Sequence, residues 1–189
     1  MLKIITVPNS ILSSPTKPVV KLDGKIKNLL IEMEKTLSSQ KDPKGVGLAA
    51  NQIGQNLSLF IIKSSEKAKT NVFINPKIIK TVGEQFIAPE KKGVMNHAPT
   101  KKSRRQPVKL EGCLSIPRIW GSVKRAKKIY LEYIDVNGKS HKKWFSGFEA
   151  TIIQHEIDHL QGKVFTQRSM EQNQPIYKEV GDELKPYEI

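Results

Sequence analysis

Apolar side chains in residues 24–38 recur at the three- and four-residue spacing of an amphipathic helix. They are Ile26, Leu29, Leu30, Met33 and Leu37. This spacing places all five on one face of a helix. The pattern therefore predicts a first helix that packs that face against a core.

Shorter apolar runs downstream predict strands. Residues 57–63 and 71–76 are indicated as buried strands, and Pro76 is expected to end the second because proline cannot donate to a sheet. Residues 127–145 alternate β-forming and polar side chains on both sides of Asn137-Gly138, the preferred pair for a type I′ turn. The sequence thus predicts an antiparallel hairpin there.

A second helix is predicted at 147–161, with Gly162 as its C-terminal cap. Turning each residue by about 100° gives two apolar faces. One face carries Ala150, Ile153, Ile157 and Leu160, and the other carries Phe148 and Ile152 together with His155 and His159. The remaining polar edge is narrow: Thr151, Gln154, Asp158 and Gln161. A helix that is apolar on two sides is expected to lie buried between layers.

Two segments lack such periodicity. Residues 83–110 are rich in Lys, Pro, Asn and Gln and are interpreted as a long loop or insertion. The segment from Gln172 onward contains Pro175 and Pro186 and is expected to form a short, weak helix at best. We therefore predict a single catalytic domain at 1–170 with a basic insertion at about 83–110, followed by a short C-terminal tail at 171–189.

Composition limits the class of protein. The 189 residues suffice for one domain with its own core, and 38% hydrophobic and 26% charged residues are ordinary for a globular protein. Apolar runs are too short for a membrane span or a signal-peptide core. A single cysteine, Cys113, excludes an internal disulfide and fits a reducing compartment. We expect a cytoplasmic protein without a membrane partner.

The formal net charge is +14, and half of this excess lies between residues 91 and 109. The basic residues there are Lys91, Lys92, Lys101, Lys102, Arg104, Arg105 and Lys109. Such a run can attract polyanions through counterion release, but a solvated loop has the same composition. Both interpretations stay open at this point.

His155 and His159 stand one helical turn apart, with Glu156 directly after the first. Two imidazoles so placed can hold one metal ion, and the carboxylate beside them can take a proton from water. Two core histidines bonded to backbone carbonyls are the alternative. A catalytic ion of this kind usually has three protein ligands.

The third ligand has three candidates: His97, His141 and Cys113. The metzincin pattern would place a further histidine at the position of Phe165, so that interpretation fails. Cys113 is favoured, because it is the lone thiol and Gly112 lets the backbone turn close to an ion.

Three segments together resemble the signature motifs of peptide deformylase. They are GVGLAANQ at 45–52, EGCLS at 111–115 and QHEIDH at 154–159. The resemblance implies an α+β fold in which the HExxH helix packs centrally against small antiparallel sheets. It also implies removal of the formyl group from N-formylmethionine at the start of newly made polypeptides, with release of formate.

The same resemblance implies roles for individual residues. Cys113, His155 and His159 match the metal ligands, and Glu156 matches the general acid/base. The side-chain amide of Gln52 and the backbone N–H of Leu114 match the donors to the oxyanion. The implied cofactor is one divalent metal ion, with iron(II) favoured by the resemblance and zinc, nickel or cobalt also suited to the ligands.

The implied partners are formylmethionyl nascent peptides. Backbone at Val46 and Gly47 would pair with the peptide as an added strand, and Gly112 would leave room beside it. Phe148 and Ile152 are candidates for the wall of the methionine pocket. A ribosome contact through the basic segment 91–109 is a further expectation.

Two other functions compete with this one. An HExxH peptidase that cuts internal bonds lacks its conventional third ligand downstream of the helix. An inactive relative that binds ribosomal RNA through its basic loop would be expected to have lost Glu156 or Gln52, and both are present.

Overall fold

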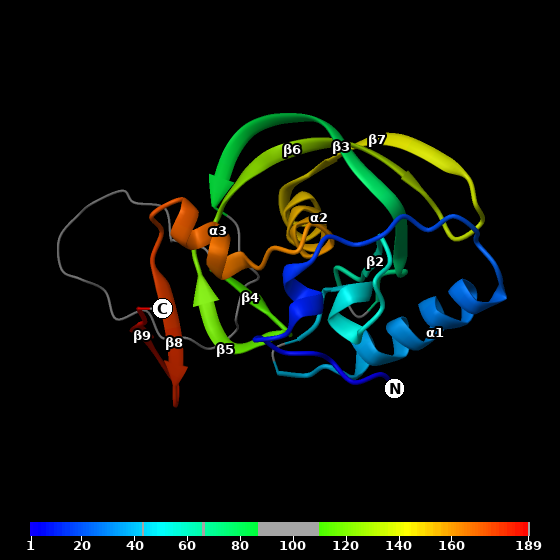
Figure 1. Ribbon diagram of the computed structural model, residues 1–189. Coiled ribbons are helices and arrows are strands. Elements are labelled where there is room, and N and C mark those ends of the chain that lie inside the picture. Colours follow the sequence, from blue (N-terminus) through cyan, green and yellow to red (C-terminus); the bar gives the residue numbers. More distant parts are fainter. Residues whose placement is uncertain (43, 66, 87–109, 189) are drawn as a thin grey trace.

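The computed structural model describes residues 1–42, 44–65, 67–86 and 110–188 (Figure 1). Within these ranges the chain forms helices α1 (Gly24–Ser39), α2 (Gly147–Leu160) and α3 (Phe165–Glu171), two short 3-10 helices (Ser10–Ser13 and Ala50–Ile53) and two antiparallel sheets. The predicted α+β class is confirmed, and both long helices begin where the sequence placed them. No helix in the described ranges is long and apolar enough to cross a membrane.

The larger sheet has five strands in the order β1 (Gly47–Ala49), β2 (Leu59–Ile62), β3 (Asn71–Phe86), β6 (Lys124–Ile134) and β7 (Ser140–Ser146). Strands β3, β6 and β7 arch over α2, which lies under their concave side (Figure 1). The order leaves β1 at an edge of the sheet.

The smaller sheet has four strands in the order β4 (Glu111–Cys113), β5 (Ile116–Gly121), β8 (Ile176–Val180) and β9 (Glu183–Pro186). Its first strand ends at Cys113. Cys113 thus lies on the smaller sheet, whereas His155 and His159 lie on α2, the helix under the larger sheet.

Helix α2 is the centre of the core, as its two apolar faces predict. Ile152, Ile153 and Ile157 pack with Phe73 and Phe145 of the large sheet. Most of the predicted polar edge is also buried: Thr151, Gln154 and Asp158 are each at most 9% exposed. These polar groups therefore require partners inside the protein.

Helix α1 buries its predicted face against the opposite side of the same sheet. Leu30, Met33 and Leu37 pack with Leu59 and Ile61 of β2. The side chain of Asp23 accepts the N–H groups of Lys25 and Ile26 and so caps the first turn.

Strand β3 does not end at Pro76 but runs through it. The register with β6 shifts between Ile74 and Lys77, and Asn75 has a φ of +49°. Such a bulge lets a strand pass a residue that has no N–H to donate. The side chain of Asn75 meanwhile accepts from and donates to the backbone of Val19, both at 2.8 Å.

The hairpin at Asn137-Gly138 is confirmed, but the predicted turn type is wrong. Gly138 has a φ of +82°, whereas Asn137 is not among the residues of positive φ. A type I′ turn requires positive φ at both central residues. Asp135 holds this turn instead, since its side chain accepts the N–H groups of Asn137 and Lys139.

The expectation of a weak C-terminal helix is also wrong. Strands β8 and β9 form a hairpin, and β8 pairs with β5 of the small sheet. The division of the chain at about residue 170 stays a prediction. Residues 83–86 of the predicted insertion belong to β3, and residues 87–109 lie outside the described ranges.

Candidate active site

A thiol and two imidazoles meet between α2 and β4. The ligand atoms of Cys113, His155 and His159 all lie within 4.8 Å of one another. The Cys113 Sγ is 3.1 Å from His159 Nε2, and both residues are buried. Of the other third-ligand candidates, His141 instead contacts Asp135 at 2.6 Å, and His97 lies outside the described residues.

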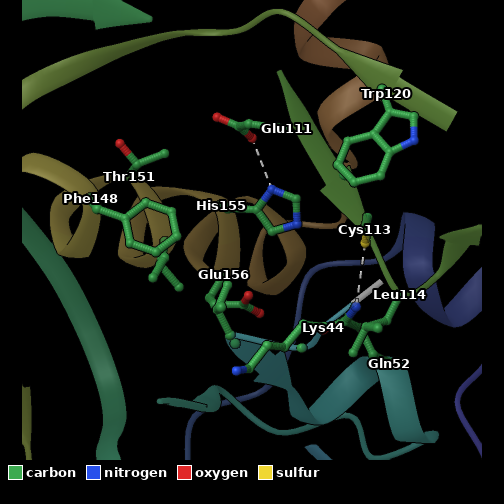
Figure 2. A pocket seen from close by; sticks show the side chains of 15 residues that line it. Lys44, Gln52, Glu111, Cys113, Leu114, Trp120, Phe148, Thr151, His155 and Glu156 are labelled. Carbon is green, nitrogen blue, oxygen red and sulfur yellow. Dashed lines mark hydrogen bonds and ion pairs between the residues drawn. The ribbon is translucent and has the colours of Figure 1, made fainter. Parts of the chain in front are cut away.

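His155 is oriented by a carboxylate that the sequence pattern did not single out. Its Nδ1 lies 2.9 Å from Oε2 of Glu111, the first residue of β4 (Figure 2). Metal-binding histidines typically donate their second ring nitrogen to such a carboxylate, which fixes the ring. The position of Glu111, two residues before the predicted thiol ligand, was the available signal.

This donor set fits one divalent ion. A thiol and two imidazoles are ligands of zinc and related transition metals, and burial without a partner would cost each imidazole free energy. The Nε2 atom of His155 is left for the cluster because its Nδ1 contacts Glu111. Three protein ligands also leave a coordination position for water or substrate.

Gln52 presents its amide nitrogen to this cluster. Its Oε1 accepts the backbone N–H of Ala49 at 2.8 Å, which fixes the orientation of the amide. Its Nε2 therefore points at Ser115 Oγ, 3.1 Å away. It also points at Cys113 Sγ, 3.5 Å away (Figure 2). A hydrogen-bond donor is thus held beside the cluster of Cys113, His155 and His159.

Glu156 is buried, and its Oε2 has no hydrogen-bond partner in the described structure. Burial raises the pKa of its carboxyl to about 7, against the smaller opposing effect of His155. A Cβ added to Gly47 would overlap this carboxyl group and would lie 3.0 Å from Ile152. The glycine therefore allows β1 to pass directly over Glu156.

A pocket opens onto these groups and contains every residue predicted to bind substrate. Its lining includes the predicted Val46, Gly47, Gly112, Phe148 and Ile152, and Leu114 as well. The sequence did not indicate Lys44, Thr151 or Trp120, which also line it (Figure 2).

Trp120 joins this pocket to the C-terminal hairpin. A Cβ on Gly112 would come within 2.8 Å of its ring, so glycine is required for the indole to lie against β4. The indole N–H donates to Oε2 of Glu179 in β8 at 2.8 Å. No local pattern could have revealed this pair, because 59 residues separate its members.

Comparison with known proteins agrees with this geometry. The sequence model of the family described as polypeptide deformylase matches residues 1–175. The chain belongs to the peptide deformylase family. It is 36% identical to the peptide deformylase of Karelsulcia muelleri over 168 residues, which is 87% of this chain and 76% of that protein. It is 35% identical to that of Borreliella burgdorferi, with coverage of 87% and 85%.

Solved structures of the family share the fold. The peptide deformylase from Legionella pneumophila superposes with a TM-score of 0.72 at 31% identity, covering 89% of this chain and 85% of that one. The enzyme from Synechococcus elongatus, solved in complex with actinonin, gives 0.73 at 31% identity, with coverage of 89% and 80%. The central HExxH helix and its sheets are therefore the family fold.

We expect each of the changes Cys113→Ala, His155→Ala and His159→Ala to remove most of the bound metal, because each deletes one of three candidate ligands. The metal content of each variant, purified without oxygen, is measured by elemental analysis. His141→Ala is the control and should keep its metal. Full occupancy in the Cys113 variant would contradict the ligand set.

Gly47→Ala should impair catalysis without unfolding the protein. The new methyl group must displace Glu156, and a shift of about 1 Å in a catalytic group can lower the rate by on the order of 100-fold. Gly24→Ala is the matched control, since a Cβ there meets nothing within 4 Å. Equal formate release by both variants would show that the close passage of β1 has no catalytic consequence.

Glu179→Ala tests whether the C-terminal hairpin positions the pocket wall. Loss of the partly buried hydrogen bond to Trp120 should raise KM for a formyl-Met tripeptide about threefold to tenfold, the range of one hydrogen bond, with kcat nearly unchanged. Glu183→Ala in β9, an exposed acid of the same hairpin, is the control. An unchanged KM would show that the hydrogen bond to Glu179 does not position the Trp120 indole for substrate binding.

Proposed function

We propose that this protein hydrolyses the N-formyl group of formylmethionyl polypeptides and releases formate. The observation that carries the proposal is the Cys113, His155 and His159 cluster beside the buried carboxyl group of Glu156, in a chain of the peptide deformylase family. Water adds to the formyl carbon, the C–N bond breaks, and the free amine and formate leave.

The proposed cofactor is one divalent ion held by Cys113, His155 and His159. When bound, the ion would lower the pKa of a water molecule towards neutrality and polarise the formyl carbonyl. Iron(II) is proposed as the native ion, and zinc, nickel and cobalt suit the same ligands.

Glu156 is proposed as the general acid/base. A carboxyl group with a pKa of about 7 exists in both protonation states near neutral pH. It can therefore accept a proton from the attacking water and return it to the departing amine. Its buried Oε2, without a partner of its own among the described residues, supports this role.

Gln52 and Leu114 are proposed to stabilise the negative charge on the formyl oxygen. The Gln52 amide is fixed by Ala49 and so needs no reorganisation as charge develops. The backbone N–H of Leu114 would be the second donor. A donor of this kind is worth roughly 3 kcal/mol in comparable sites.

The substrate backbone is proposed to extend the large sheet at β1. This strand pairs with β2 on one side only and forms the sheet edge, so Val46 and Gly47 can pair with an extended peptide. Gly112 lines the same pocket from β4, and Phe148 and Ile152 supply the apolar wall for the methionine side chain.

A cytoplasmic location and an encounter with nascent chains are part of the same proposal. The basic segment 91–109, suggested as a ribosome contact, lies outside the described residues.

Two other functions are less favoured. For a peptidase that cuts internal bonds, the third ligand would be expected downstream of the helix, whereas the third candidate here comes from β4. An inactive relative would not be expected to keep Glu156 and Gln52 in place.

Glu156→Gln should keep the fold and the metal yet lower formate release by at least about 100-fold, the usual scale of general acid–base catalysis. The amide keeps the size of the side chain but cannot carry the proton. Formate is measured with a formyl-Met tripeptide, and metal content is measured on the same sample. Near-normal turnover would exclude Glu156 as the proton carrier, and Gln52→Leu tests the oxygen donor in the same assay.

A further inference from the structure

Strands β3, β6 and β7 have a second face, opposite the concave side that covers α2 (Figure 1). The strand register pairs Tyr130 with Trp144 and Lys80 with Tyr130, so these three side chains share one face. Ile129 and Phe145, the neighbours in sequence, point to the core and are buried. We call the surface formed by Lys77, Lys80, Lys128, Glu132, Lys142, Tyr130 and Trp144 the outer sheet face.

Two aromatic rings lie at the middle of this face. Trp144 is 48% exposed, and its ring centroid is 5.2 Å from that of the partly buried Tyr130. A cross-strand aromatic pair stabilises a hairpin, which accounts for the side of Trp144 that meets Tyr130. It does not account for a large indole surface left in water.

Cationic side chains surround the rings on all three strands. Lys77 and Lys80 lie on β3, Lys128 on β6 and Lys142 on β7, and all four are exposed. Among the side chains of this face that the structure describes, Glu132 is the single acid, and it forms an ion pair with Lys142 at 3.0 Å. Four lysines against one glutamate leave a positive surface on a chain whose net charge is already +14.

We propose that the outer sheet face binds single-stranded RNA, with a base stacked on Trp144 and phosphates beside Lys80 and Lys128. An exposed aromatic ring on an antiparallel sheet flanked by cations suits unpaired bases, because every base offers a flat π-face. An acidic protein would use the lysines but would not require the indole face, and the vesicle experiment below separates RNA from a lipid surface. The site is separate from the proposed hydrolysis, which takes place under the concave side.

The stacking part is tested with Trp144→Leu and a fluorescent oligouridylate of about 10 nucleotides, a length within the usual site size. Affinity should fall about fivefold or more, the lower end of the effect of removing one stacked base. Trp144→Phe should keep part of the affinity, because a ring remains. An abasic chain of equal length and charge should bind wild type and Trp144→Leu equally.

Tyr187→Leu is the matched control for the ring. This tyrosine is 39% exposed and has Lys178 over its ring at 5.6 Å, but it lies beyond β9 and not on the outer sheet face. Its variant should bind the oligouridylate as wild type does.

The electrostatic part is tested with Lys80→Gln and Lys128→Gln combined. The slope of log affinity against log salt should flatten by about 0.7 for each phosphate that the variant no longer neutralises. Lys25→Gln with Lys27→Gln, two exposed lysines of α1, removes equal charge elsewhere and should change the slope less.

Formate release from a free tripeptide and the melting temperature show whether each variant is folded. If Trp144→Leu binds the oligouridylate as tightly as wild type, the proposal is overturned. It is also overturned if the affinity difference persists on the abasic chain. Trp144-dependent binding to phosphatidylglycerol vesicles without any to RNA would assign the face to a membrane instead.

Discussion

The buried contact between Glu111 and Arg125 holds the active site together. Arg125 donates through Nε and Nη2 to the two oxygens of Glu111, at 2.7 and 2.8 Å, and through Nη1 to Asp158 at 2.5 Å. Glu111 precedes the thiol on β4 and also contacts His155 on α2. One guanidinium thus joins the strand that carries Cys113 to the helix that carries His155 and His159, the three candidate metal ligands. A buried charge left without its partner costs several kcal/mol, so the ligand geometry depends on this contact.

In the cluster of Glu111, Arg125 and Asp158, each side chain lies against one of opposite charge. Burial alone would raise the pKa of Glu111, but Arg125 and the bond to His155 outweigh it and lower the pKa to about 2. A carboxylate whose folded pKa is depressed contributes stability above its ordinary value of 4.5, and the contribution disappears as the pH falls towards 2. Asp158 further pairs with Arg168 of α3 at 2.7 Å. The Glu111 carboxylate therefore stays ionised through the neutral range, and it can hold both Arg125 and His155 there.

The sequence revealed the parts of the site that depend on local spacing. His155 and His159 are one turn apart, and the two-sided helix indicated that they are buried, so a metal site could be inferred before any fold was known. Trp120 and Arg125 were not predicted, because their partners Glu179 and Asp158 lie 59 and 33 residues away. The C-terminal hairpin was missed for the same reason: β8 is ordered by pairing with the distant β5, β9 by pairing with β8, and their own sequence has little apolar alternation.

Side chains of strands β6 and β7 alternate between the core around α2 and the outer sheet face. Ile129 and Phe145 must fit the core around α2, where a change of volume would disturb the helix that carries His155 and His159. Tyr130 and Trp144, their neighbours in sequence, do not pack in this core, because successive side chains of a strand point to opposite faces. The outer sheet face can therefore vary in charge and aromatic content without altering the candidate metal ligands. A surface of this kind can acquire a binding role while the catalytic geometry beneath the sheet stays fixed.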